Sequence, residues 1–504
     1  MSDSIEKIKF PELFFGFVAP IGADLSPVLL AFRKYFEYRN YRIIEVKATD
    51  IFDVLQKYIP PKRTLNKARH RERYESYITY GNQLREKFDD AILAATAIRR
   101  VMARRLRVQK VNDKFSRTVF LLHQFKRKEE IDLLRRVYGR LFFQISIYSR
   151  RAARIDYLSN RFAANDHGAT SQKYLPAAEE LIQKDENEIG EFHGQRVAAI
   201  FHDADFITNL DVTESVEKQV NRFCELIFGS NCISPTKSEY GMFLAKAAAL
   251  RSLDLSRQVG AAIFSPASEI LALGSNEVPK SGGGTYWCDD PYDDRDYVRK
   301  IDSNHVRKRE ILSELVSIVD PNADLDRLFE DKRIRDSQLM DALEYGRVVH
   351  AEMGALSDAA RLGHPVKGGI LYCTTFPCHM CAKHIIAAGI AKVVFLEPYP
   401  KSLAPRLHLD SISVEGGDRG HYQKYPAAEF EHFYGVSPRR YREIFERSKR
   451  KDDSNGTFIE YSGGEPMPII AIEYPSYADL ETYITDRAMK EIRSVVRDTE
   501  IAEA

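Results

Sequence analysis

The stretches His350-Ala351-Glu352 and, further along, Pro377-Cys378-His379-Met380-Cys381 decide how this chain folds. Among them, His350, Cys378 and Cys381 make a set of three zinc ligands, and no obvious fourth follows nearby in the sequence. A structural zinc site is normally closed by four protein ligands, whereas a catalytic zinc keeps one position for water. The pattern therefore predicts a zinc ion with an open position and Glu352 as a carboxylate beside it that is not a ligand.

Local sequence predicts that these ligands sit at the starts of two helices. Helix formers follow His350, so His350 and Glu352 should lie on a first helical turn, and a buried strand comes next. Pro377 suits the first turn of a second helix, where Cys378 and Cys381 would share a face at the positive end of the helix dipole. We therefore expect two helix starts to face each other across one strand and to close on a metal.

Glu352 fits the role of a proton shuttle in a hydrolytic deamination. Zinc lowers the pKa of its water toward about 7 and supplies hydroxide at neutral pH. A carboxylate whose pKa is raised by an apolar pocket could take the water proton, pass it to N3 of a cytosine ring and protonate the departing amine. The combined pattern H-x-E…P-C-x-x-C is the signature of zinc nucleobase deaminases, and it is far more specific than either half alone.

Residues from about 236 to 412 resemble the deoxycytidylate deaminase branch of the cytidine deaminase superfamily. The segments that carry this resemblance are 251–261 (RSLDLSRQVGA), 274–276 (GSN) and 383–397 (KHIIAAGIAKVVFLE). The resemblance implies an α/β/α domain, that is, a central sheet flanked by helices with the zinc between two of them. It also implies strands at 259–264 and 270–273.

The same resemblance suggests which residues bind the substrate. It implies that Asn276 contacts the sugar hydroxyl of a deoxycytidine nucleotide, although an ordinary turn asparagine is the open alternative. Tyr399, Lys401 and Arg406 stand downstream of the zinc motif, where they could hold a substrate phosphate.

Residues 1–225 form a separate α/β unit that resembles a degenerate P-loop kinase-like domain. We expect buried strands at 13–19, 41–47, 118–124, 141–147 and 204–208. A working phosphate loop reads G-x-x-x-x-G-K-[ST], but Gly16 and Gly22 are one residue too far apart, and Ala23 and Asp24 replace the lysine and the hydroxyl. ATP hydrolysis is therefore not expected. The two glycines could bind a cofactor nucleotide, or equally be turn glycines without a ligand.

Basic residues are concentrated in that unit. The whole chain carries a net charge of +1, whereas residues 51–150 carry about +14. One basic cluster contains Arg104, Arg105 and Arg107. Another runs from Lys67 to Arg73 and is followed by Tyr74, Tyr77 and Tyr80. Such a surface is typical of RNA or nucleotide binding, and a helical face whose charges pair internally is the open alternative. A regulatory RNA is our leading prediction for a partner of this unit, and a nucleotide is the second.

The remaining segments belong, on sequence grounds, to a deaminase domain spanning 236–504. Within it, 279–349 is an insertion and 415–504 a packed C-terminal extension. The acidic loop TYWCDDPYDDRDY at 285–297 could cap the active site, bind a regulatory nucleotide through Mg²⁺ or hold a second metal, and Cys288 is expected to be a buried thiol. In the family that this region resembles, oligomers with inserts near here are usual, so a homo-oligomer is expected.

Composition sets the outer bounds. A chain of 504 residues with 44% hydrophobic and 29% charged residues is typical of a globular protein with more than one domain. It has no apolar run of membrane-spanning length, a polar N-terminus, and six cysteines that form no disulfide framework, so a cytoplasmic location is expected.

The combined architecture resembles the bacterial two-domain antiphage deoxycytidine nucleotide deaminases. That resemblance implies conversion of dCTP, dCMP or both to uracil nucleotides with release of ammonia, which drains a pool that a phage needs, and restraint by an RNA. Three alternatives are open: a housekeeping dCMP deaminase for thymidylate synthesis, a polynucleotide cytosine deaminase, and a binding protein with an inactive site. Asn276 argues against the second, and the intact zinc and Glu352 positions argue against the third.

Overall fold

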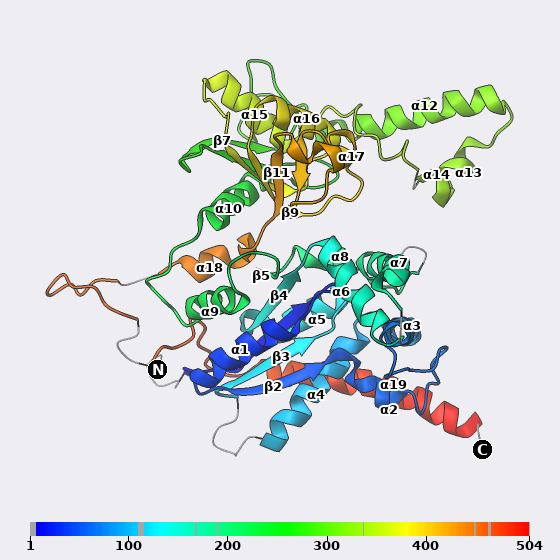
Figure 1. Cartoon of the computed structure of the whole chain (residues 1–504), viewed down its shortest axis with the longest axis vertical. Helices are drawn as coiled ribbons and strands as arrows, with labels where there is room; N and C mark the ends of the chain where they lie inside the picture. Colours follow the sequence, from blue (N-terminus) through cyan, green and yellow to red (C-terminus); the bar gives the residue numbers. More distant parts are fainter. Residues whose placement is uncertain are drawn as a thin grey trace. The chain divides into compact units, whose positions relative to one another are not determined.

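The computed structural model describes residues 7–108, 115–166, 169–188, 191–335, 337–447, 450–461 and 465–502 (Figure 1). The chain divides into two compact units. The first unit comprises Met1–Ser234 together with Tyr434–Ala504, and the second unit comprises Pro235–Phe433. Within the described ranges, no helix is both long and apolar enough to cross a membrane.

A parallel sheet with one antiparallel edge strand forms the centre of the first unit. Its strands are β1 (Leu13–Val18), β2 (Arg42–Lys47), β3 (Thr118–His123), β4 (Phe142–Tyr148), β5 (Phe206–Asn209) and β12 (Gly435–Val436). Their order is β12-β5-β4-β1-β3-β2, and only β12 runs antiparallel to its neighbour. The five strands expected from apolar runs are confirmed, each within two residues of its predicted bounds.

Helices cover both faces of this sheet. They are α1 (Ser26–Tyr38), α2 (Phe52–Leu55), α3 (His70–Lys87), α4 (Ile92–Val108), α5 (Lys128–Tyr138), α6 (Arg151–Ala163), α7 (Leu175–Glu186), α8 (Val197–Phe201), α9 (Val216–Ile227), α18 (Tyr441–Phe445) and α19 (Tyr477–Ala502). On β1, Phe15 packs against Phe32 of α1. The preceding residue, Phe14, packs against Tyr138 of α5 and Tyr477 of α19. Because successive strand residues point to opposite faces, α1 covers one face and α5 with α19 covers the other.

The final helix corrects the predicted domain boundary. We expected 415–504 to extend the deaminase domain, but the residues from Tyr434 onward belong to the first unit. The physical reason is a buried ion-pair network: Arg105 of α4 contacts Glu12 at 2.8 Å and Glu481 of α19 at 2.6 Å. The Tyr477 hydroxyl also donates a hydrogen bond to Glu12. Since Arg105, Glu12 and Glu481 are all buried, α19 is held against the first unit by charges that water does not screen.

The same network changes the interpretation of the basic clusters. Arg105 is 5% exposed and Tyr80 is fully buried, so neither can contact an RNA. Other basic residues have acidic partners, including Lys62 with Glu86, Arg63 and Arg71 with Glu75, Lys67 with Asp53, and Arg100 with Asp50. The internally paired face therefore accounts for much of the charge excess. A regulatory RNA stays a prediction that would have to rest on exposed residues such as Arg107.

Gly16 is not part of a phosphate loop, which corrects the prediction made for it. It lies inside β1, where a Cβ atom would be 2.4 Å from the ring of Phe142 on the neighbouring strand. The residue is therefore glycine because two strands pack closely there. Gly22 does lie in the loop after β1, with φ +89°, and a Cβ atom there would be 2.8 Å from Arg154. The kinase-like assignment of this unit stays a prediction.

The second unit is built on a mixed sheet of order β10-β11-β9-β8-β6-β7. Its strands are β6 (Gly260–Phe264), β7 (Ile270–Ser275), β8 (Ile370–Thr375), β9 (Lys392–Glu397), β10 (Ile412–Val414) and β11 (Ala428–His432). Its helices are α10 (Lys237–Ala249), α11 (Asp296–Arg299), α12 (Ser303–Val319), α13 (Leu325–Glu330), α14 (Lys332–Arg335), α15 (Ala351–Leu362), α16 (His379–Ala387) and α17 (Ala404–Leu407). Strand β6 is antiparallel to both of its neighbours, and the strands from β8 to β10 are parallel.

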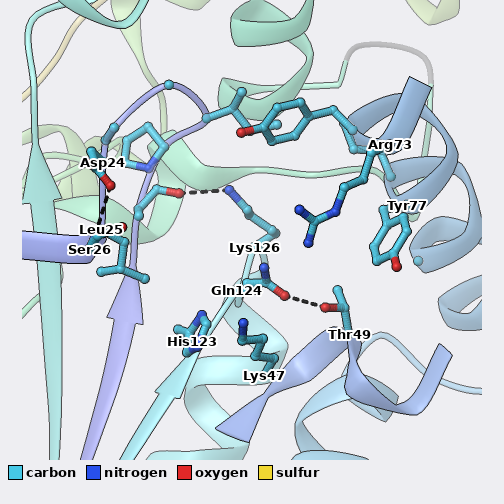
Figure 2. Close-up of a pocket in the computed structure, with 18 of the residues that line it drawn as sticks. Asp24, Leu25, Ser26, Lys47, Thr49, Arg73, Tyr77, His123, Gln124 and Lys126 are labelled. Carbon is cyan, nitrogen blue, oxygen red and sulfur yellow. Dashed lines mark hydrogen bonds between the residues drawn. The ribbon is translucent and has the colours of Figure 1, made fainter. Parts of the chain in front are cut away.

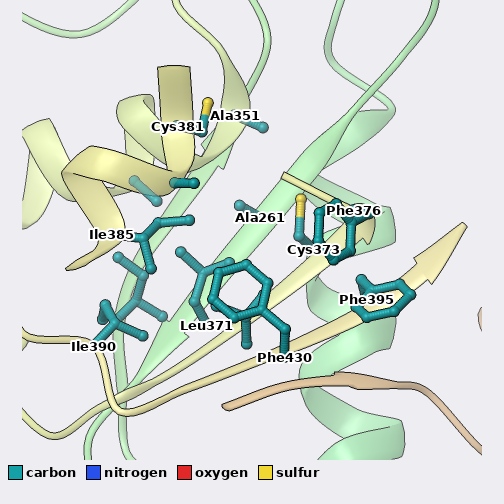
Figure 3. Close-up of a cluster of buried hydrophobic side chains, with 14 of the residues drawn as sticks. Ala261, Ala351, Leu371, Cys373, Phe376, Cys381, Ile385, Ile390, Phe395 and Phe430 are labelled. Atoms are coloured by element: carbon teal, nitrogen blue, oxygen red, sulfur yellow. The ribbon is translucent and has the colours of Figure 1, made fainter. Parts of the chain in front are cut away.

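Two layers of helices enclose that sheet. Ala261 of β6 faces the apolar cluster that contains Ala351 and Ile385, from α15 and α16 (Figure 3). Phe264 of β6 faces the opposite side, where it packs against Tyr240 of α10. The predicted α/β/α arrangement is therefore found in residues 235–433. The sheet places the starts of α15 and α16 above the same edge of the core.

The insertion at 279–349 carries the long helix α12, the short helices α11, α13 and α14, and an acidic loop in which several charges are paired. Asp290 pairs with Lys280 at 2.5 Å, and Asp293 pairs with Arg295 at 2.6 Å. Cys288 is exposed, so the expectation of a buried thiol was wrong, because this loop lies at the surface of the unit. A nucleotide held there through Mg²⁺ stays a prediction.

Replacing Arg105 with methionine should destabilise the first unit by about 3–5 kcal/mol, since two buried carboxylates would lose their shared cation. Hydrogen–deuterium exchange of β1 and α19 amides measures this directly. The matched control is Arg99→Met on the same helix, where the side chain is exposed. Equal protection of these amides in the two variants would contradict the account of α19.

Candidate metal centre

The first metal ligand is presented by the start of α15. His350 is the N-cap residue of that helix, with φ −65° and ψ 153°, and its carbonyl accepts the first helical hydrogen bond, from Gly354 N at 2.8 Å. We predicted His350 on the first turn; it instead lies one residue before it. The extended N-cap conformation leaves the imidazole free of the helix, so that the ring can approach the second helix.

A glycine on β7 fixes the position of this helix start. A Cβ atom on Gly274 would lie 2.1 Å from the carbonyl oxygen of Ala351 and 2.5 Å from Ala355 N. No other residue type permits so close an approach of strand and helix. The predicted Gly-x-Asn turn therefore has a structural consequence that the sequence did not reveal: it brings His350 and Glu352 down onto the sheet.

The second and third ligands come from the start of α16. Cys378 is its N-cap residue, and Cys381 lies on the first turn; Pro377, expected within the first turn, precedes the helix. The Sγ atoms of Cys378 and Cys381 are each 3.3 Å from His350 Nδ1. His379 faces away and contacts Glu344 at 3.3 Å, which agrees with the expectation that it does not join the two cysteines.

The three side chains fit a zinc ion. Their donor atoms all lie within 4.8 Å of one another, and among the described residues this is the group of His, Cys, Asp and Glu side chains close enough to share a metal. Tetrahedral zinc with bonds of about 2.1 Å to nitrogen and 2.3 Å to sulfur needs ligand–ligand separations of roughly 3.5 Å, which the observed distances approach. The neighbouring Cys381 and His350 also lower the pKa of Cys378, so this thiol ionises readily to the form that binds metal.

Glu352 lies beside the cluster without joining it. The side chain is 3% exposed, and burial, followed by the nearby Cys378, raises the pKa of this carboxyl above its ordinary value. The apolar environment that we predicted for a proton shuttle is thus present. Sequence reasoning missed Cys373 of β8, a buried residue near Glu352: burial, followed by the Glu352 carboxylate, raises the pKa of its thiol, which therefore stays protonated. Its position at the buried end of a strand gave no signal beyond apolar character.

Asn276 follows β7 and is 6% exposed. Its Oδ1 accepts a hydrogen bond from Val259 N at 2.7 Å, and its Nδ2 donates to the Arg257 carbonyl at 2.8 Å. The side chain thus joins the end of β7 to the approach to β6. The structural alternative for Asn276 has direct support, and contact with a substrate sugar stays a prediction.

The residues predicted to hold a phosphate lie in the loop after β9. Tyr399 packs against the core of the second unit, and Lys401 pairs with Asp341 at 2.6 Å. Sequence reasoning overlooked Arg257 for this purpose. Its guanidinium lies 5.5 Å from the Tyr399 ring centre and 3.0 Å from Glu397, so it joins the 251–261 motif to this loop. Arg406 lies on α17. Substrate binding by this group stays a prediction.

Purified protein should contain about one zinc per chain, and Cys378→Ala or Cys381→Ala should lose it because two ligands hold divalent metal poorly. Elemental analysis by mass spectrometry measures the content. Cys288→Ala is the matched control, since that thiol is exposed, and it should keep its zinc. Full occupancy in both ligand variants would refute the assignment.

Gly274→Ala should displace the first turn of α15 and lower zinc affinity by about 10- to 100-fold, the usual effect of disturbing the support of a metal ligand. Competition with a chelator gives the affinity. Gly354→Ala serves as the control, because its nearest neighbours would be 3.6 Å away. If both variants held zinc equally well, the close packing of β7 on α15 would not be what positions the zinc ligand His350.

Comparisons with known proteins agree with this geometry. Residues 235–397 match the sequence model of the cytidine and deoxycytidylate deaminase zinc-binding region. The chain is 30% identical over 183 residues to the probable deoxycytidylate deaminase of Drosophila melanogaster. The aligned region covers 35% of this chain and 69% of that protein. It is also 44% identical over 54 residues to the deoxycytidylate deaminase of Enterobacteria phage T4, covering 11% of this chain and 28% of that one.

Two further similarities are more limited. ComE operon protein 2 of Bacillus subtilis is 43% identical over 53 residues, 10% of this chain and 28% of that protein; the match thus spans less than a third of the length of either this relative or the phage enzyme. The crystal structure of dCMP deaminase from the cyanophage S-TIM5 aligns with 40% of this chain and all of its own, at 20% identity and a TM-score of 0.22. On the strength of the sequence similarities and of the zinc motif, the chain belongs to the zinc-dependent cytidine and deoxycytidylate deaminase family.

Proposed function

We propose that this chain catalyses the hydrolytic deamination of deoxycytidine nucleotides, converting dCMP, dCTP or both to the uracil nucleotide with release of ammonia. The observation that carries the proposal is the buried carboxyl of Glu352 beside a three-ligand cluster. A site with four protein ligands and no adjacent carboxylate would serve structure rather than chemistry.

Each residue of the cluster has a separate task. His350, Cys378 and Cys381 would hold the zinc ion, which when bound makes a water reactive at neutral pH. Glu352 takes a proton from the attacking water and delivers it to N3 of the cytosine ring as the oxygen adds to C4. The same carboxyl then takes the remaining proton of the hydroxyl added at C4 and passes it to the amino group, so that the C4–N bond breaks, the C4 carbonyl of the uracil ring forms and ammonia leaves. The Cys373 thiol, whose pKa is raised by burial and by the nearby Glu352, stays neutral and adds no second negative charge beside the carboxyl.

The preference for deoxynucleotides rests on similarity. The relatives that cover the largest part of their own length are named deoxycytidylate deaminases, and the 251–261 motif and Asn276 match that branch. Arg257 lies over the Tyr399 ring, and Lys401 follows in the same loop, where it pairs with Asp341; these cationic and aromatic groups suit a phosphate on a nucleotide. A free nucleotide is therefore favoured over a cytosine within a polymer.

The biological role is a finer part of the proposal. The fusion of a deaminase unit to a second, larger compact unit is the feature that resembles the antiphage deaminases, and it is not needed for a housekeeping dCMP deaminase. We infer that the activity lowers the deoxycytidine nucleotide pool during infection. Cells that express the wild-type chain should show a smaller dCTP pool and fewer phage plaques than cells that express Glu352→Gln, and equal values would remove this role.

Glu352→Gln should lower the rate of deamination by at least about 10²-fold, because the amide keeps the shape of the side chain but can neither accept nor release a proton near neutral pH. Formation of the uracil-containing product is measured separately with dCMP, dCTP, CMP, CTP and a cytosine-containing oligonucleotide. Zinc content should not change. Glu431→Gln, an ion-paired glutamate of β11 at the surface, is the control and should retain full activity.

The substrate panel separates the alternatives. Turnover of dCMP or dCTP with little on the ribonucleotides supports the proposal. Rapid deamination of the oligonucleotide, with none of the free nucleotides, would instead assign the chain to the polynucleotide deaminases. Substantial turnover by Glu352→Gln would show that another group carries the protons.

A further inference from the structure

A cavity of about 530 Å³ opens in the first unit, at the carboxyl ends of β1, β2 and β3 (Figure 2). Its volume lies in the range of small-molecule sites. The walls are the loop after β1, the ends of β2 and β3, and side chains from α3 and α6. All of these elements belong to the first unit, so the cavity is separate from the zinc cluster.

The topology of the sheet favours a ligand at this place. From β1 the chain passes through α1 to β2 on one side, whereas from β3 it passes through α5 to β4 on the other side of β1. The connections therefore diverge between β1 and β3, which are neighbours in the sheet. Parallel α/β sheets bind ligands in the crevice outside the carboxyl ends of the strands at such a switch point.

The cavity carries an excess of positive charge. Six cationic side chains and two carboxylates line it. In the described part of the chain, neither Arg73 nor Arg161 has a carboxylate partner: Arg73 lies over the Tyr77 ring, and Arg161 donates to the Tyr157 hydroxyl. Lys126 also lines the cavity, but its ammonium donates to the Ala19 carbonyl at 2.8 Å and lies 2.8 Å from Asp185 (Figure 2). Unpaired guanidinium groups at a half-buried site are costly unless an anion completes them.

Buried polar groups at the cavity wall also lack partners. His123 is 4% exposed and Gln195 is 6% exposed. Among the described residues, His123 Nδ1 and Gln195 Oε1 have no hydrogen-bond partner. Gln124, which follows His123 and also lines the cavity, has φ +75°, a conformation that costs free energy for a residue other than glycine. Buried polar atoms are usually satisfied, so these groups indicate a polar ligand.

Apolar and aromatic side chains also line the cavity. Leu29, Phe52 and Tyr77 are among them, and the ring centres of Phe52 and Tyr77 are 5.5 Å apart. Apolar and aromatic side chains next to basic ones match a ligand with a flat base and an anionic tail.

We propose that this cavity binds a nucleoside polyphosphate, with its phosphates near Arg73 and Arg161 and its base against the apolar and aromatic side chains of the lining. The loop after β1 has Asp24 where a working phosphate loop has its hydroxyl residue, and its carboxylate accepts a hydrogen bond from Ser26 N at 3.0 Å. The site therefore binds the nucleotide without transferring a phosphoryl group.

Calorimetric titration of the full chain with ATP and GTP tests the proposal, because neither contains the cytosine that the zinc unit would take. We expect one site per chain. Arg73→Met and Arg161→Met should each weaken binding by about tenfold or more, since each removes a charged contact to phosphate. Arg99→Met, which removes an exposed arginine of the same unit, should bind as the wild type does.

Two probes identify the parts of the ligand that are recognised. Adenosine should bind much more weakly than ATP, and inorganic tripolyphosphate should bind more weakly than ATP but depend on Arg73. Zinc content and deamination by Arg73→Met should equal those of wild type, which shows that the variant folds. This control keeps the result independent of the deaminase proposal, since nucleotide binding can fail while deamination persists, and the reverse.

Other outcomes would overturn the proposal. Absence of binding at millimolar ATP and GTP would do so, as would binding that neither arginine variant weakens. Tripolyphosphate binding as tightly as ATP would remove the base site. If a single-stranded RNA binds through Arg73 and Arg161 while free nucleotides do not, the positive charge of this cavity belongs to an RNA surface instead.

Discussion

The close packing of β7 against the first turn of α15 is the constraint on which the zinc unit depends. At Gly274 the strand backbone approaches the Ala351 carbonyl so closely that a Cβ atom cannot be accommodated. This contact fixes the N-cap residue His350 and the buried Glu352 at the edge of the core. The start of α16 meets them there with two thiols. Ligand geometry and proton transfer thus depend on one strand–helix contact.

The chemistry of the site could be predicted from the sequence because its residues lie in two short motifs. His350, Cys378, Cys381 and Glu352 have side chains of distinct chemistry at fixed spacing, and local helix starts are enough to bring each pair together. Cys373 could not be predicted, since it lies near Glu352 only through the pairing of β8 in the sheet. Asn276 was singled out by its motif as a residue that contacts the substrate sugar. The hydrogen bonds of its side chain are instead to the backbone of Val259 and Arg257.

The strands of the first unit were also predictable, because parallel strands buried on both faces are continuous apolar runs. The place of the final helix was not. Glu481 pairs with Arg105 across more than 370 residues of sequence, and no local pattern reveals such a contact. For the same reason Arg105 looked like part of an exposed basic cluster, although it is buried between two carboxylates. Gly16 looked like a loop glycine because strand packing against Phe142 is equally invisible in the sequence.

The central claim is that three protein ligands leave the zinc ion one open position beside Glu352. X-ray absorption at the zinc edge of the purified chain measures it most directly. The account predicts two sulfur atoms at about 2.3 Å and two lighter atoms at about 2.0–2.1 Å, one of them histidine nitrogen and the other exchangeable with solvent or an added anion. A spectrum with a third sulfur, or with light-atom ligands that no added anion displaces, would contradict it.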